Sequence, residues 1–138
     1  MSRHGTIAVD EFLPHPRERV WAALTTRELL ARWLLPADFE LCVGHRFTLD
    51  MHNWGITTCE VLDFEPGVML RYSWRNDPLD TVVTWRLVEE GTGTRLLLEH
   101  SGFDLDHPVQ RFAFERMGGG WRSRVLPALD AALGGVPG

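Results

Sequence analysis

The chain has 138 residues, 44% of them hydrophobic, and a formal net charge of -5. This length fits one domain, residues 1–138, that buries roughly two thirds of the surface its unfolded chain would expose. The negative charge argues against a nucleic-acid-binding surface, because affinity for phosphates depends on clustered cations. All fourteen cations are arginines, which excludes catalysis through a lysine Schiff base.

Cysteine and histidine spacing gives no sign of a metal or disulfide framework. Cys42 and Cys59 form no Cys-x-x-Cys pair, and no two of the six histidines are four residues apart. No apolar run approaches the length of a membrane span, and no signal-peptide pattern is present. We therefore expect a cytoplasmic protein with no metal, no cofactor, no nucleic-acid partner and no membrane span.

The first third of the chain predicts one strand and two short helices. Alternation over Thr6 to Phe12 indicates a strand that is partly buried on both faces. Pro16 suits the first position of a helix, and an apolar stripe follows it. Thr25 and Glu28 match a capping box, so a second helix is expected from Thr26 to about Trp33.

The middle of the chain predicts five more strands. Turn-forming residues at Asn53, Pro66-Gly67, Asn76-Asp77-Pro78 and Gly91-Thr92-Gly93 separate these segments. The connections are short, so the strands are expected to form an antiparallel meander. The predicted strands are His45 to Met51, Gly55 to Phe64, Val68 to Arg75, Thr81 to Glu89 and Thr94 to Gly102.

A long helix is predicted from Pro108 to just before Gly134, with apolar residues recurring at three- to five-residue steps. Its interior contains Gly118-Gly119-Gly120 and Pro127, which both disfavour a helix. The glycines allow two interpretations: they leave space for a cavity beside the sheet, or they mark a break between two helical pieces. The expected fold is α+β, a six-stranded curved antiparallel sheet wrapped around the C-terminal helix.

The order of these features resembles the START-like (SRPBCC) superfamily with its helix-grip fold, and within it the branch similar to the C-terminal domain of the activator of the heat-shock-protein-90 ATPase. The resemblance spans nearly the whole chain. It is carried by Val20-Trp21, Leu24, Trp33, Gly44, Phe47, Gly55, Val61, Pro66, Leu70-x-Tyr72-x-Trp74, Val83, Leu87, Gly91-x-Gly93-Thr94, His100-Ser101-Gly102-Phe103 and Gly120-Trp121. The superfamily includes lipid carriers, hormone receptors, polyketide cyclases and aromatases, and chaperone regulators, so the fold does not decide the function.

Strand alternation places a set of apolar side chains on the face of the sheet that meets the long helix, with Thr57, Tyr72 and His100 as polar exceptions. An apolar cavity with a few polar groups is typical of a small-molecule site. The predicted ligand-binding residues are Trp33, Phe47, Met51, Cys59, Tyr72, Trp74, Trp85, Leu98, His100, Met117 and Trp121.

Three functions remain open. The first, which we favour, is a non-catalytic small-molecule-binding domain that holds an apolar, aromatic or lipid-like ligand. The second is a polyketide cyclase- or aromatase-like enzyme in which His100 and Tyr72 act as acid and base. The third is a stress-response chaperone regulator that acts through its surface. A homodimer is also open, because nothing in the sequence fixes the oligomeric state.

Overall fold

The computed structural model describes residues 3–52 and 55–134. Six strands form one antiparallel sheet in the order β1-β6-β5-β4-β3-β2. The predicted turn residue Asn53 lies outside the described residues. The strands are β1 (His4–Leu13), β2 (Arg46–Asp50), β3 (Ile56–Glu65), β4 (Met69–Asn76), β5 (Leu79–Glu90) and β6 (Gly93–Asp104).

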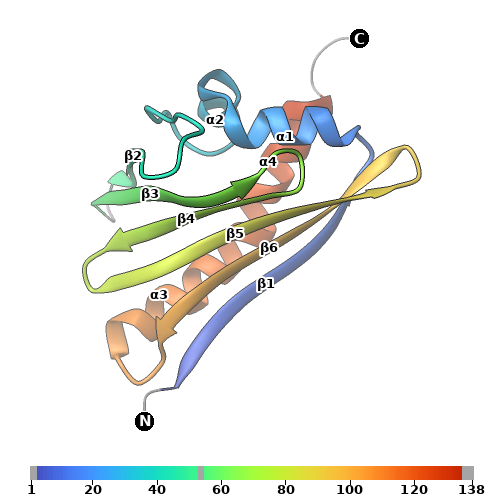
Figure 1. Cartoon of the computed structure of the whole chain (residues 1–138). Coiled ribbons are helices and arrows are strands. Elements are labelled where there is room, and N and C mark those ends of the chain that lie inside the picture. Colours follow the sequence, from blue (N-terminus) through green and yellow to red (C-terminus); the bar gives the residue numbers. More distant parts are fainter. Residues whose placement is uncertain (1–2, 53–54, 135–138) are drawn as a thin grey trace.

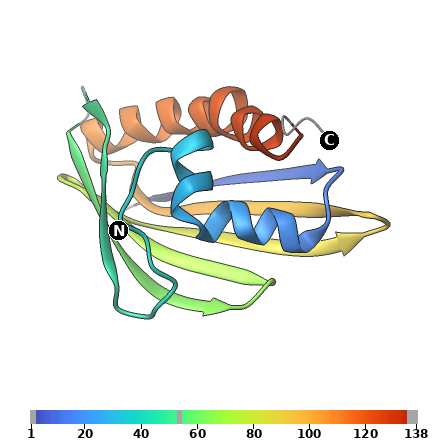
Figure 2. The ribbon, with the colours of Figure 1, turned by 90° about the horizontal axis from the view of Figure 1, so that it is seen from above.

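The sheet curves around one long C-terminal helix, so the α+β prediction is confirmed (Figures 1 and 2). Register shifts between Gly5 and Thr6 and between Val61 and Asp63 are bulges, which bend and twist a sheet locally. From β2 to β6 the strands pair in chain order, as the short turns predicted, and β1 pairs with β6. The inner face of the sheet is therefore concave toward the helix.

Two short helices, α1 (Arg17–Thr25) and α2 (Arg27–Trp33), follow β1 and lie near the C-terminal end of the long helix (Figure 1). The predicted capping box is wrong. The N-cap residue is Thr26, and it makes no side-chain capping bond, whereas the Thr25 hydroxyl donates to the Trp21 carbonyl 2.8 Å away. The Trp33 indole N–H donates to the Ala23 carbonyl over 2.7 Å, and this bond joins the two helices.

The long helix consists of α3 (Pro108–Gly120), a π-helical turn η2 (Trp121–Val125) and α4 (Leu126–Gly134). It begins as predicted, with His107 as the N-cap and Pro108 in the first turn. Pro127 has no N–H, and in a regular α-helix its ring would clash with the Ser123 carbonyl four residues earlier. The wider π turn lies immediately before this proline, and in it the Leu126 N–H bonds to the Trp121 carbonyl.

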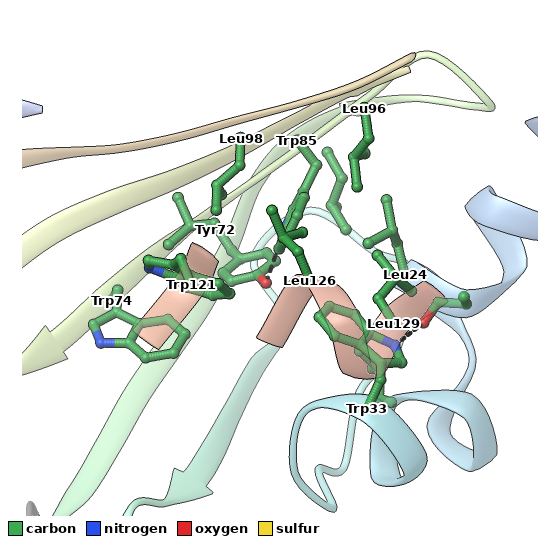
Figure 3. Close-up of a cluster of buried hydrophobic side chains, with 14 of the residues drawn as sticks. Leu24, Trp33, Tyr72, Trp74, Trp85, Leu96, Leu98, Trp121, Leu126 and Leu129 are labelled. Atoms are coloured by element: carbon green, nitrogen blue, oxygen red, sulfur yellow. Dashed lines mark hydrogen bonds between the residues drawn. The ribbon is translucent and has the colours of Figure 1, made fainter. Parts of the chain in front are cut away.

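The core lies between the inner face of the sheet and the helices, and tryptophans dominate its centre (Figure 3). Trp85 meets Trp33 and Trp121 edge to face, with ring centroids 5.7 and 5.6 Å apart. Trp74 makes the same type of contact with Trp121 at 5.8 Å. Edge-to-face pairs of this kind stabilise a core beyond the burial of their area, so these rings hold the helix against the sheet.

Candidate functional site

A cavity of about 350 Å³ lies between the inner face of the sheet and the long helix. Residues in or beside β2, β3, β4 and β5 form one wall, α3 and η2 form the other, and the segment after α2 completes the lining. Its volume falls at the lower end of the roughly 300–1,000 Å³ typical of ligand pockets. The apolar lining residues are Leu34, Leu35, Met51, Trp74, Leu79, Ala113, Met117, Trp121 and Val125.

The cavity has a buried floor and a charged mouth. Trp74, Trp121 and Thr57 are buried, and the Thr57 hydroxyl accepts a hydrogen bond from the Asn76 amide over 3.3 Å. The exposed lining residues are His52, Arg116 and Arg124, and they therefore mark the opening to solvent. The lining contains no aspartate or glutamate within the described parts of the chain. An apolar ligand can thus enter past groups that are neutral or positive.

Gly120 connects the glycine run to the cavity. It lies in the lining, and a Cβ atom placed on it would meet no heavy atom within 4 Å. Gly118 faces β1 instead, where a Cβ would lie 3.8 Å from the Ile7 side chain. Gly119 is exposed and also has open space. The helix is continuous through all three glycines, and the space at Gly120 agrees with the interpretation that a glycine enlarges the cavity.

The structure brings some of the predicted ligand-binding residues to the cavity. Met51, Trp74, Met117 and Trp121 line it, as does Thr57. Phe47 and Tyr72 border a separate gap that is too small to hold a water molecule. The other predicted residues are buried elsewhere in the core: Trp33, Cys59, Trp85, Leu98 and His100. Burial raises the pKa of the Cys59 thiol to about 12, so it is a protonated thiol.

His100 is fully buried, and both of its ring nitrogens are hydrogen-bonded. The Thr81 hydroxyl donates to the Trp74 carbonyl over 2.7 Å, so it must accept from the His100 Nε2–H, which is 2.8 Å away. Nδ1 in turn accepts from the Trp121 indole N–H over 3.1 Å. This arrangement requires a neutral ring with its proton on Nε2. Burial lowers the pKa of His100 to about 3.

Tyr72 is also buried, and its hydroxyl accepts a hydrogen bond from the Trp85 indole N–H over 2.9 Å. Burial raises the pKa of this phenol above its usual value. Neither Tyr72 nor His100 lines the cavity. Both side chains bond tryptophans inside the core, and neither belongs to the residues that line the cavity.

Several lining residues were missed by sequence reasoning. Arg116 and Arg124 lie four residues on either side of Gly120, and in a regular α-helix this spacing is an ordinary surface pattern. Leu34 and Leu35 follow α2 in an irregular segment, where no periodicity indicates which way a side chain points. Asn76 and Leu79 flank the β4–β5 turn, which the sequence identified only as a turn.

Residues 3–52 and 55–134 show neither a membrane-crossing helix nor a metal-binding group. No helix in these ranges is long and apolar enough to cross a membrane. No three or more His, Cys, Asp or Glu side chains gather there as metal ligands. Cys42 is exposed and Cys59 is buried, and both are free thiols. Within these ranges, the cavity is therefore the feature with the geometry of a small-molecule site.

The fold and sequence are similar to those of several solved structures. Protein MLL2253 from Mesorhizobium loti shares 38% identity and a TM-score of 0.86, with 96% of this chain and 98% of that protein covered. Protein BH1534 from Bacillus halodurans shares 31% identity and a TM-score of 0.84 over 96% and 99% of the two chains. CalU16 from Micromonospora echinospora shares 26% identity and a TM-score of 0.80 over 100% and 86%.

No curated protein matches the sequence. The family model described as "Activator of Hsp90 ATPase homolog 1-like protein" matches residues 14–134. The match begins just after β1 and runs through the last described residue of α4, and it includes every cavity-lining residue. The resemblance predicted from the sequence is therefore confirmed. This chain belongs to the activator of Hsp90 ATPase homolog 1-like family, which has a START-type fold.

Proposed function

We propose that this domain binds a small, largely apolar molecule in the cavity between the sheet and the long helix. The observation that carries this proposal is the cavity itself, which has a tryptophan floor and an opening to solvent. Transfer of apolar surface from water into such a site contributes roughly 25 cal/mol per Å². Trp74 and Trp121 give the floor two large apolar side chains, which suit an aromatic or acyl ligand.

The cavity has an opening to solvent, so a ligand can reach it without separation of the core. Gly120 leaves its part of the helix surface bare, and Met51 and Met117 are flexible side chains that can adapt to a ligand's outline. A preformed site reduces the entropy lost when a ligand is bound. These features support reversible binding of a compound with one or two rings or a short acyl chain.

The cyclase-type alternative requires acid and base groups on the cavity wall. His100 and Tyr72 were the candidates for that role, and both are hydrogen-bonded within the core away from the lining. The chaperone-regulator alternative rests on the family's description, and no contact or charge arrangement described above favours it. Ligand binding is thus the function that the geometry supports best.

Methionine-methyl NMR tests the proposal, because the chain's methionines differ in position. Met51 and Met117 line the cavity, whereas Met69 lies on β4 outside it and serves as an internal control. We would titrate the protein with 2-naphthoate, 2-naphthamide, decanoate and decanamide. Saturable shifts of the Met51 and Met117 methyl signals, with Met69 unchanged, are expected for at least one compound. If none of the four compounds moves those two signals, the proposed function is wrong.

A further inference from the structure

We infer that the ligand is an amphipathic carboxylic acid, bound with its apolar part on the tryptophan floor and its carboxylate between Arg116 and Arg124 at the mouth. This inference rests on the proposed function, since it names the chemical class of the molecule in the same cavity. Both arginines belong to the lining, one from α3 and one from η2.

The two arginines differ from most others in the chain. Eight of the fourteen arginines have a carboxylate oxygen within 4.0 Å, so ion pairing is their usual state. Across residues 3–52 and 55–134, neither Arg116 nor Arg124 has such a partner. The neighbouring Glu115 is 4.0 Å from Arg111, and it is not in the lining. Within the part of the chain that the structure describes, the positive charge at the mouth is therefore not cancelled by carboxylates.

Contacts on the helix hold one of these groups in place. The Arg116 guanidinium carbon lies 5.1 Å from the centre of the Phe112 ring, one helical turn earlier. The attraction of a cation to an aromatic face holds the guanidinium in place and leaves its N–H groups available as hydrogen-bond donors. At the opposite edge, the Asp50 carboxylate accepts from the backbone N–H of His52 and is outside the lining.

The π turn explains how both arginines reach the same cavity. In an uninterrupted α-helix, residues eight apart are rotated by about 80° around the axis, at 100° per residue. A π turn acts as an α-helix with one inserted residue, which moves that offset toward about 20°. The turn at Trp121–Val125 begins after Arg116 and contains Arg124. Pro127 disfavours a regular α-helix in this segment. The π turn found there brings the two positive charges closer to the same side of the helix.

Carboxylate is the group that this arrangement fits. A guanidinium binds a carboxylate through paired N–H···O bonds, and such charge-assisted bonds are stronger than neutral ones. A ligand with a cationic group would be repelled at the mouth, and a wholly apolar ligand would gain nothing from the charge of the two guanidinium groups. The apolar floor meanwhile rejects a small, fully hydrated anion, so the ligand must combine an acid group with an apolar body.

Each acid of the NMR titration differs from its amide in charge while keeping the same body and nearly the same shape. We expect 2-naphthoate and decanoate to bind about tenfold more tightly than 2-naphthamide and decanamide, since a charge-assisted pair contributes more than a neutral hydrogen bond. The advantage should shrink as salt is added, because the mouth is exposed. The dissociation constants come from the Met51 and Met117 signals.

The double variant Arg116→Gln/Arg124→Gln should reduce the acid-to-amide difference to within about twofold, since the remaining charges are distant and screened. The amides should still shift the Met51 and Met117 signals of this variant, which shows that the cavity is intact. The matched control is Arg71→Gln/Arg86→Gln, which removes the same charge from exposed positions on the outer face of the sheet. That control should keep the full difference.

Two results would overturn the inference and leave the proposed function standing. One is equal binding of acid and amide by the unmodified protein, with the Met51 and Met117 signals shifting for both. The other is an acid preference that survives in the Arg116→Gln/Arg124→Gln variant. Failure of all four compounds to shift those signals is a different result, and it would remove the proposed function together with the inference.

Discussion

The Trp121 indole N–H donates a 3.1 Å hydrogen bond to Nδ1 of His100, and this bond joins the long helix to β6 inside the core. Trp121 also lies beside the cavity and forms part of its floor. His100 lies outside the lining, yet it fixes the ring that a ligand would contact. His100, the acid–base candidate of the cyclase alternative, thus positions a wall of the cavity.

His100 should make the protein's stability depend on pH. Its pKa is about 3 in the folded protein and near 6.5 when unfolded. The unfolded chain therefore binds a proton between these values that the folded protein does not, so stability is full above pH 6.5 and falls as the pH drops toward 3. This effect should reach on the order of 3 kcal/mol between pH 6.5 and 4.

The comparison variant is His100→Asn, which cannot titrate in this range. Urea unfolding, followed by tryptophan fluorescence at pH 7 and pH 4, should show a smaller loss of unfolding free energy for the variant than for the parent protein. Carboxylates contribute equally to both proteins, so the difference isolates His100. Parallel stability profiles for the two proteins would contradict the burial and neutral state of this ring.

Tyr72→Phe separates a structural role from a binding role. The change leaves the Trp85 indole N–H buried without its acceptor, which should lower the unfolding free energy by about 1–3 kcal/mol. Ligand affinity should stay unchanged, because Tyr72 does not line the cavity. Denaturant unfolding and the methyl titration provide the two readings. Loss of binding at unchanged stability would instead place the hydroxyl in contact with the ligand.

The three consecutive glycines should respond differently to alanine. Gly119 and Gly120 have open space around a new Cβ, so alanine at either position should raise stability by about 1 kcal/mol through better helix propensity. At Gly118 the Cβ would lie 3.3 Å from the Arg122 guanidinium, which bonds the Gly118 carbonyl. The gain there should be smaller. Thermal unfolding of the three variants checks this order, and equal gains would contradict it.

Much of the fold could be predicted because local signals and tertiary structure agree. Alternation on a half-buried sheet has a period of two, so residues such as Leu70 and Leu98 could be assigned to the inner face from the sequence alone. Short turns restrict which strands pair. The failed capping box shows the limit: Thr25 and Thr26 are adjacent and chemically equivalent, and the Thr25 hydroxyl bonds a carbonyl of the preceding helix.

The cavity could be predicted only in part, because alternation assigns a face and does not show what fills the space opposite. Trp74 and Tyr72 share the inner face two residues apart, yet Trp74 borders the cavity and Tyr72 lies against Trp85. Which of the two side chains borders the cavity depends on the position of the long helix along the sheet. Arg116 and Arg124 are exposed, so their sequence gives an ordinary surface pattern, and a regular helical period does not reveal the π turn that brings both to the cavity.

The most direct test of the account fills the cavity from the helix side. Isothermal titration calorimetry would measure the tightest-binding of the four compounds against the parent protein, Gly120→Leu and Gly119→Leu. Both variants replace a glycine with the same side chain, and only position 120 lies in the lining. Gly120→Leu should weaken binding by at least about tenfold, because the leucine side chain would occupy space that the ligand needs. A tenfold change corresponds to a loss of roughly 1.4 kcal/mol of binding free energy. Gly119→Leu should bind normally, and equal affinity of the two variants would contradict a ligand site in this cavity.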